Sequence, residues 1–127
     1  MKRVLIDEGV PHPVRGWIEN ADVFSVQWLG WAGIKNGELI QRVNEEGFDV
    51  VVTSDQQWSY QQNRSQWRFG VVELSTNYLP VILVAAKKGD LKARLNHAVF
   101  LALPGEIIAL EIENDSKYED VNGGDET

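Results

Sequence analysis

Two aspartates each follow a short apolar run, and their positions could bring two carboxylates to one site. Asp7 comes directly after Val4-Leu5-Ile6, and Asp55 comes two residues after the run 48–53. If these runs are neighbouring strands of a parallel sheet, both carboxylates overhang the crevice beyond the strand ends, where such sheets bind ligands. Two carboxylates that meet repel each other, and either protonation of one or a bound cation relieves that repulsion.

A carboxylate pair of this kind supports metal-assisted hydrolysis of a phosphate ester. The chain has no cysteine, so its ligands would be mainly oxygens, which select hard ions such as Mg²⁺ or Mn²⁺. Such an ion polarises a phosphate oxygen, lowers the pKa of a bound water and orients in-line attack. Aspartates that follow strands are also common in turns and helix caps. On spacing alone, this structural interpretation carries equal weight.

The segments that would position these carboxylates alternate between strand and helix patterns. Strands are predicted at 2–6, 22–26, 48–53, 69–74 and 106–112, and helices at 36–46 and 91–102. Asn36 is expected to cap the first of these helices and Gly47 to end it. Residues 79–86 fit either a helix or a strand.

This alternation predicts an α/β fold, a three-layer α/β/α sandwich with a mainly parallel central sheet of about five strands. Three consecutive valines, 50–52, indicate a strand buried on both faces, as is usual in parallel sheets. One domain over residues 1–113 suits a chain of 127 residues. The acidic stretch 114–127, with two glycines, is predicted to be a disordered tail.

Charge and hydropathy restrict the class of protein. The net charge of −7 argues against a protein that coats nucleic acid by bulk electrostatics. It leaves room for an enzyme in which a metal ion supplies the positive charge that a phosphate needs. The longest apolar run, 79–86, is far shorter than the roughly 20 residues that span a bilayer. With no cysteine and no apolar N-terminal region, we expect a soluble cytoplasmic protein without membrane contact.

Several segments, in order, resemble a branch of the PIN-domain superfamily, which comprises small predicted nucleases often encoded as toxins of toxin–antitoxin pairs. They are Val4-Leu5-Ile6-Asp7-Glu8-Gly9-Val10-Pro11, Leu29-Gly30-Trp31-Ala32-Gly33, Asn36-Gly37-Glu38-Leu39, Phe48-Asp49-Val50-Val51-Val52-Thr53-Ser54-Asp55, Tyr60-Gln61-Gln62-Asn63 and Pro104-Gly105-Glu106. The likeness spans residues 2–112. Each piece alone is weak, and the order of the pieces carries the resemblance.

The resemblance implies a cluster of three or four acids that holds Mg²⁺ or Mn²⁺ and cleaves RNA. Asp7 and Asp55 match the acids of its first and third strands. Glu38 matches the acid at the start of its second helix, although a carboxylate in a first helical turn is also favoured by the helix dipole. The family often carries another acid shortly after the third strand, where this chain has Gln56-Gln57-Trp58.

Polar residues near these positions are candidates for binding substrate. Gln61, Gln62 and Asn63 could contact a phosphate or orient a water near Asp55, and the alternative is a polar segment that fixes the loop. Further candidates are Glu8, Lys35 and Arg64. Two tryptophans in the glycine-rich loop, Trp28 and Trp31, are the best candidates for a protein interface.

The leading hypothesis is a metal-dependent endoribonuclease that acts as a toxin restrained by an antitoxin protein, and the resemblance also allows a homodimer. The first alternative is a non-catalytic PIN-like module that binds RNA or a protein, which the missing acid and the negative charge favour. The second alternative is a small-molecule phosphatase of flavodoxin-like type. It shares the logic of aspartates at strand ends, but the order of the motifs speaks against it.

Overall fold

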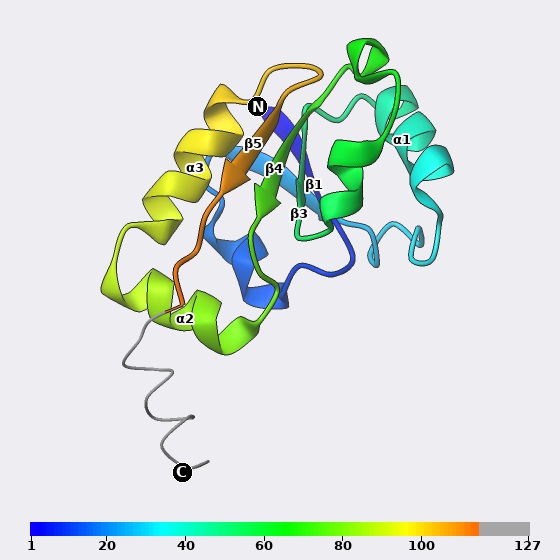
Figure 1. Ribbon diagram of the computed structural model, residues 1–127. Coiled ribbons are helices and arrows are strands. Elements are labelled where there is room, and N and C mark those ends of the chain that lie inside the picture. The colour runs from blue at the N-terminus through cyan, green and yellow to red at the C-terminus, as the bar shows by residue number, and fades with distance from the viewer. Residues whose placement is uncertain (115–127) are drawn as a thin grey trace.

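Five short strands form one sheet in which every neighbouring pair is parallel. The computed structural model describes residues 1–114, so the predicted tail lies, apart from its first residue, outside the described residues. The sheet order is β2-β1-β3-β4-β5. The strands are β1 (Lys2–Ile6), β2 (Ala21–Ser25), β3 (Val50–Thr53), β4 (Gly70–Leu74) and β5 (Ile107–Leu110). This sheet and its flanking helices confirm the predicted α/β class (Figure 1).

Three α-helices and three short 3₁₀ helices connect the described strands. They are η1 (His12–Trp17), α1 (Asn36–Glu45), η2 (Gln56–Tyr60), η3 (Arg64–Gln66), α2 (Leu79–Lys88) and α3 (Leu91–Leu101). The ambiguous segment 79–86 is helical, and Pro80 lies in its first turn, where a missing N–H is not needed. Within residues 1–114, no helix combines the length and apolarity needed to cross a membrane.

The predicted cap of α1 is wrong by one residue. Lys35 occupies the N-cap position with extended backbone angles, and Asn36 is already helical. No side chain caps this helix end. The other end behaves as predicted, because Gly47 adopts φ +73°, a left-handed conformation that glycine reaches without steric cost.

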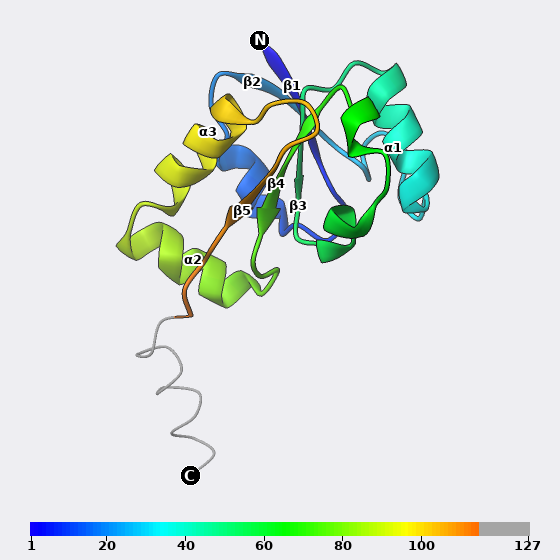
Figure 2. The same cartoon turned by 45° about the horizontal axis from the view of Figure 1, so that its top comes forward.

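The core consists of two buried clusters, one on each face of the sheet. Successive strand residues point to opposite faces, so Val50 and Val52 join one cluster while Val51 joins the other. The first cluster receives side chains from η1, α2 and α3, and the second from α1 and the aromatic segments that follow β3. Figures 1 and 2 show this arrangement, with α1 on one side of the sheet and α2 and α3 on the other.

Gly70 is required where β4 meets the chain that leads to β5. A Cβ atom on Gly70 would lie 2.7 Å from the carbonyl oxygen of Leu103 and 2.9 Å from Cβ of Ala102. Both distances are shorter than normal contacts, and one involves backbone. Any other residue here would therefore push the turn before β5 away from the sheet and disturb the register of β4, the strand beside β3.

Candidate functional site

Asp7 and Asp55 reach one cavity at the carboxyl edge of the sheet. β1 and β3 are hydrogen-bonded neighbours, with Ile6 opposite Val52. The chain after each strand therefore emerges at the same edge. Both aspartates line a cavity of about 530 Å³ there. The structure thus brings these two predicted residues together.

One buried hydroxyl connects the two aspartates. Thr53 is fully buried, and its Oγ1 donates a hydrogen bond of 2.7 Å to Oδ2 of Asp7. The same oxygen accepts a hydrogen bond of 2.9 Å from the backbone N–H of Asp55. The side chain of one aspartate and the backbone of the other are therefore held by the same atom, which limits how far the two residues can separate.

The two carboxylates differ in how much of their hydrogen-bonding capacity is used. Asp7 accepts from Thr53 Oγ1, from Trp58 Nε1 at 3.1 Å and from the backbone N–H of Glu8 at 2.8 Å. An ionised carboxylate offers about four lone-pair sites, so roughly one remains on Asp7. Asp7 is therefore rigidly oriented by its surroundings.

Asp55 is exposed and much less engaged. Its Oδ1 accepts a hydrogen bond of 2.9 Å from the backbone N–H of Gln57, which caps η2. No donor within residues 1–114 reaches its Oδ2. Asp55 therefore has a free oxygen on a side chain that lines the cavity, whereas Asp7 contributes mainly a fixed negative charge.

Glu73 adds a third carboxyl group that sequence reasoning missed. It pairs with Thr53 in the register of β3 and β4, and alternation along the strands places both side chains on the same face. Its Oε2 is buried and has no hydrogen-bond partner within the described residues. Burial, followed by the negative charge of Asp55, raises the pKa of the Glu73 carboxyl. The signal in the sequence was a single acid inside the apolar run 69–74.

Replacing Glu73 by glutamine is expected to stabilise the metal-free protein at neutral pH. The pKa of Glu73 in the folded protein lies above its ordinary value of 4.5, so wild type loses stability as the pH rises from that value through the folded pKa. Glutamine has no proton to lose. Thermal unfolding in EDTA between about pH 4 and pH 8 should show a gap that widens with pH. A pH-independent gap between wild type and Glu73→Gln would contradict the assignment.

The other predicted site residues divide between four locations. Glu8 and Lys35 line the cavity with Asp7 and Asp55. Glu38 does not line it. Its carboxylate forms an exposed ion pair of 3.5 Å with Arg42, one turn further along α1. Its assignment as a metal ligand remains a prediction of the resemblance.

Gln61, Gln62 and Asn63 line a second cavity, together with residues of α1, rather than the one that holds Asp55. Arg64 donates two hydrogen bonds, of 3.2 and 3.0 Å, to the carbonyl oxygen of Gly105. That contact ties η3 to the turn before β5. Arg64 therefore has a structural role, which the sequence did not predict.

Within residues 1–114, no three Asp, Glu, His or Cys side chains cluster closely enough to form a complete metal site. Any ion at the carboxyl edge would therefore rely on the Asp7–Asp55 pair together with water or substrate oxygens.

The two tryptophans predicted to form an interface differ in their exposure. Trp28 is 72% exposed and remains an interface candidate, whereas Trp31 is only 9% exposed and packs against Phe48 in the core. The interface prediction for Trp31 is wrong.

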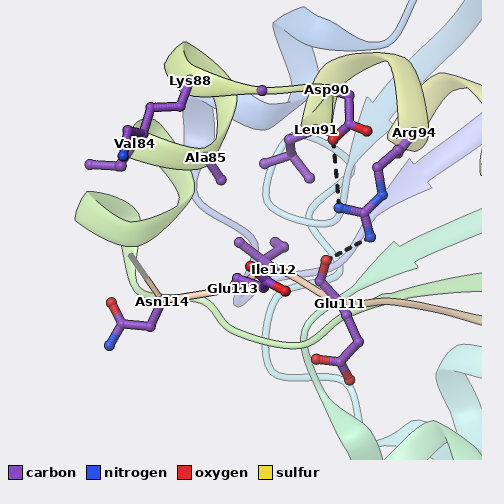
Figure 3. Close-up of a pocket in the computed structure, with 11 residues that line it drawn as sticks. Val84, Ala85, Lys88, Asp90, Leu91, Arg94, Glu111, Ile112, Glu113 and Asn114 are labelled. Atoms are coloured by element: carbon purple, nitrogen blue, oxygen red, sulfur yellow. Dashed lines mark hydrogen bonds and ion pairs between the residues drawn. The ribbon is translucent and has the colours of Figure 1, made fainter. Parts of the chain in front are cut away.

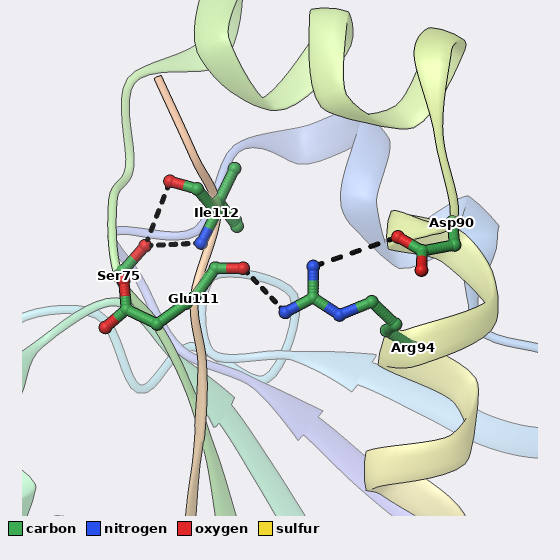
Figure 4. Close-up of polar contacts among 5 residues, drawn as sticks. All are labelled: Ser75, Asp90, Arg94, Glu111 and Ile112. Atoms are coloured by element: carbon green, nitrogen blue, oxygen red, sulfur yellow. Dashed lines mark hydrogen bonds and ion pairs between the residues drawn. The ribbon is translucent and has the colours of Figure 1, made fainter. Parts of the chain in front are cut away.

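A larger cavity, of about 760 Å³, lies away from the predicted residues, between the α2–α3 corner and the chain that follows β5 (Figure 3). Arg94 is already used there, because it donates a hydrogen bond of 2.7 Å to the carbonyl oxygen of Glu111 and lies 3.9 Å from Asp90. Ser75 exchanges hydrogen bonds with the backbone of Ile112 (Figure 4). These contacts fasten the chain after β5 to the fold.

Comparisons of the chain with protein-family models, with curated proteins and with solved structures found no match.

Proposed function

We propose that the protein is a metal-dependent ribonuclease of PIN-like type, which hydrolyses phosphodiester bonds with Mg²⁺ or Mn²⁺ held between Asp7 and Asp55. One observation carries this proposal. Both carboxylates line the same cavity at the carboxyl ends of adjacent parallel strands, and the buried Thr53 hydroxyl connects them.

The donor set fits a hard cation. Mg²⁺ is commonly held by one or two carboxylates, while waters and substrate phosphate oxygens complete its coordination. Asp55 supplies a free carboxylate oxygen, and Asp7 retains about one lone-pair site. Bound there, the ion would polarise a phosphate oxygen and lower the pKa of an attacking water.

The protein's own residues bind and orient the reacting groups. Lys35 lines the cavity and is exposed, so its ammonium can bind a phosphate of the substrate and offset part of the negative charge. The indole of Trp58 and the hydroxyl of Thr53 keep the Asp7 carboxylate in one orientation. Glu8, which also lines the cavity, can accept a hydrogen bond from a water or a ribose hydroxyl.

The biological context follows from the resemblance and forms part of the proposal. A small cytoplasmic ribonuclease of this branch would act as the toxin of a toxin–antitoxin pair and would be held inactive by an antitoxin protein. Trp28, exposed in a glycine-rich loop, is the residue through which such a partner or a second copy of the chain would anchor.

A second candidate is a non-catalytic PIN-like module that binds RNA or protein. Two observations favour it: three hydrogen bonds already occupy Asp7, and the carboxyl edge lacks a complete acidic cluster within residues 1–114.

Incubation of the full chain with labelled single-stranded RNAs, with Mn²⁺ or with EDTA, decides between these functions. The nuclease proposal predicts RNA cleavage that requires the metal. Calorimetric Mn²⁺ binding without turnover would support the non-catalytic module. Hydrolysis of p-nitrophenyl phosphate with RNA left intact would support a phosphatase instead.

A further inference from the structure

A second cavity of about 530 Å³, beside the one that holds Asp7 and Asp55, has a different chemistry. Five amide side chains and two aromatic rings dominate its lining: Asn44, Gln61, Gln62, Asn63, Gln66, Tyr60 and Trp67. None of the described residues that line it carries a charge. We refer to this cavity as the amide pocket.

The amides of the pocket are only partly used by the fold. Asn44 is engaged through both ends of its amide, to the backbone of Gln66 and Arg68. Gln62 and Gln66 are exposed, and their side-chain amides make no hydrogen bond within residues 1–114. Each amide offers two N–H donors and one carbonyl acceptor. The pocket therefore presents uncharged donors and acceptors side by side, as needed to pair with the edge of a nucleobase.

Aromatic rings complete this chemistry. Tyr60 ends η2 and is 76% exposed, so its ring is available to a ligand. Trp67, which also lines the pocket, is buried and lies stacked on Phe69 with ring centroids 5.0 Å apart. A rigid floor and an exposed ring suit a flat ligand, since unpaired bases stack on aromatic side chains.

Neighbouring residues of α1 line the amide pocket and the Asp7–Asp55 cavity. Leu39 of α1 lines the Asp7–Asp55 cavity, while its neighbour Ile40 lines the amide pocket. On the other side, the short helix η2 leads directly from Asp55 to Tyr60. Elements α1 and η2 thus connect the lining of one cavity to that of the other, and we take a polynucleotide with one phosphate at Asp55 to reach the amide pocket with a nearby nucleotide.

We propose that the amide pocket binds an unpaired nucleobase of single-stranded RNA, adjacent to the phosphate that is cleaved. This inference rests on the proposed ribonuclease function and assigns that function a substrate subsite. It changes the role predicted for Gln61, Gln62 and Asn63, which contact a base rather than a phosphate. Because amide groups distinguish donor from acceptor on a base edge, the pocket gives the enzyme a base preference.

Fluorescence anisotropy with labelled eight-nucleotide RNAs of A, C or U tests the pocket, in EDTA so that binding is separated from cleavage. Tyr60→Ala is expected to raise the Kd at least fivefold, because stacking on the ring is lost. Gln62→Ala is expected to raise the Kd at least twofold, by a factor that differs between bases. Matched controls are Phe100→Ala, an exposed aromatic on α3 that lines neither cavity, and Gln41→Ala, an exposed amide on the outer face of α1. Both controls should bind like wild type.

A base-free ribose-phosphate strand of the same length distinguishes base from backbone. Tyr60→Ala should leave the affinity for this base-free strand unchanged. If Tyr60→Ala weakens binding of the base-free strand as much as binding of RNA, base binding is overturned. The pocket assignment also fails if wild type binds none of the RNAs, or if both pocket variants bind like wild type.

The ribonuclease proposal and the base site can fail independently, and the two failures give different results. RNA binding that depends on Tyr60, with no cleavage in Mn²⁺, would remove the enzyme and leave the base site standing. Metal-dependent cleavage that Tyr60→Ala does not slow at subsaturating RNA would keep the enzyme and remove the base site.

Discussion

Replacing Asp55 by asparagine is expected to lower Mn²⁺-dependent RNA cleavage by about 100-fold or more while the fold survives. Removing groups that merely orient metal ligands costs about 10–100-fold, so loss of a ligand should cost at least as much. Asparagine retains the oxygen that accepts from the N–H of Gln57. Its NH₂ group takes the place of Oδ2 of Asp55, which accepts no hydrogen bond from the described residues. Cleavage rate and thermal unfolding, measured on the same preparation, check both halves of this prediction.

The same change at Asp7 should reduce activity and stability together. Three donors surround the Asp7 carboxylate, two at Oδ2 and one at Oδ1. Either orientation of an asparagine amide points its NH₂ group at a donor, which costs about 1–3 kcal/mol of unfolding free energy. Urea unfolding of Asp7→Asn should show this loss, and Asp55→Asn should not. The Asp55 variant is therefore the cleaner probe of the metal site.

Two further variants complete this comparison. Asp22→Asn removes an equivalent charge from an exposed position on β2 that does not line the cavity, and it should leave cleavage unchanged. Glu38→Gln decides whether the acid implied by the resemblance is needed in addition to the pair. Full cleavage by Asp55→Asn protein would eliminate the proposed site.

The sheet could be predicted from the sequence because its local signals agree with one another. The valine run 50–52 requires burial on both faces, and Gly47 ends the preceding helix, so β3 is defined by its own residues and its boundary. Asp7 and Asp55 follow from the same logic, since a polar residue after a parallel strand must emerge at the carboxyl edge.

The rest of the site depends on spatial neighbours that no local pattern reveals. Glu73 lies close enough to Asp55 to be affected by its charge, because β4 pairs with β3 in a register that places it opposite Thr53. Gln61 was expected near Asp55 from its closeness in sequence. Burial of the Trp58 side chain turns the chain through η2, and Gln61 instead lines the amide pocket with residues of α1. The course of a loop is thus decided by which of its residues enters the core.

Trp58 links the core to the site, so its removal should have the largest effect on stability. It is fully buried and contacts Trp67 and Phe69 edge-on, at 5.9 and 6.0 Å between ring centroids. Trp58→Ala is expected to cost about 3–5 kcal/mol of unfolding free energy, as large-to-small changes of buried aromatics do. That loss is a large fraction of the about 5–15 kcal/mol that stabilises a typical domain. Urea unfolding followed by far-UV circular dichroism measures this loss.

Trp58→Phe separates packing from orientation of the carboxylate. Phenylalanine keeps much of the aromatic contact but has no N–H to donate to Oδ2 of Asp7. We expect a loss of about 1–2 kcal/mol in stability, together with a cleavage rate about 10–100-fold lower, because a ligand loses part of its support. The control Trp28→Phe makes the same change at an exposed tryptophan, and it should change neither the stability nor the cleavage rate. If Trp58→Phe protein is destabilised but cleaves RNA at the wild-type rate, the indole serves packing alone, and Thr53 and the Glu8 N–H suffice to orient Asp7.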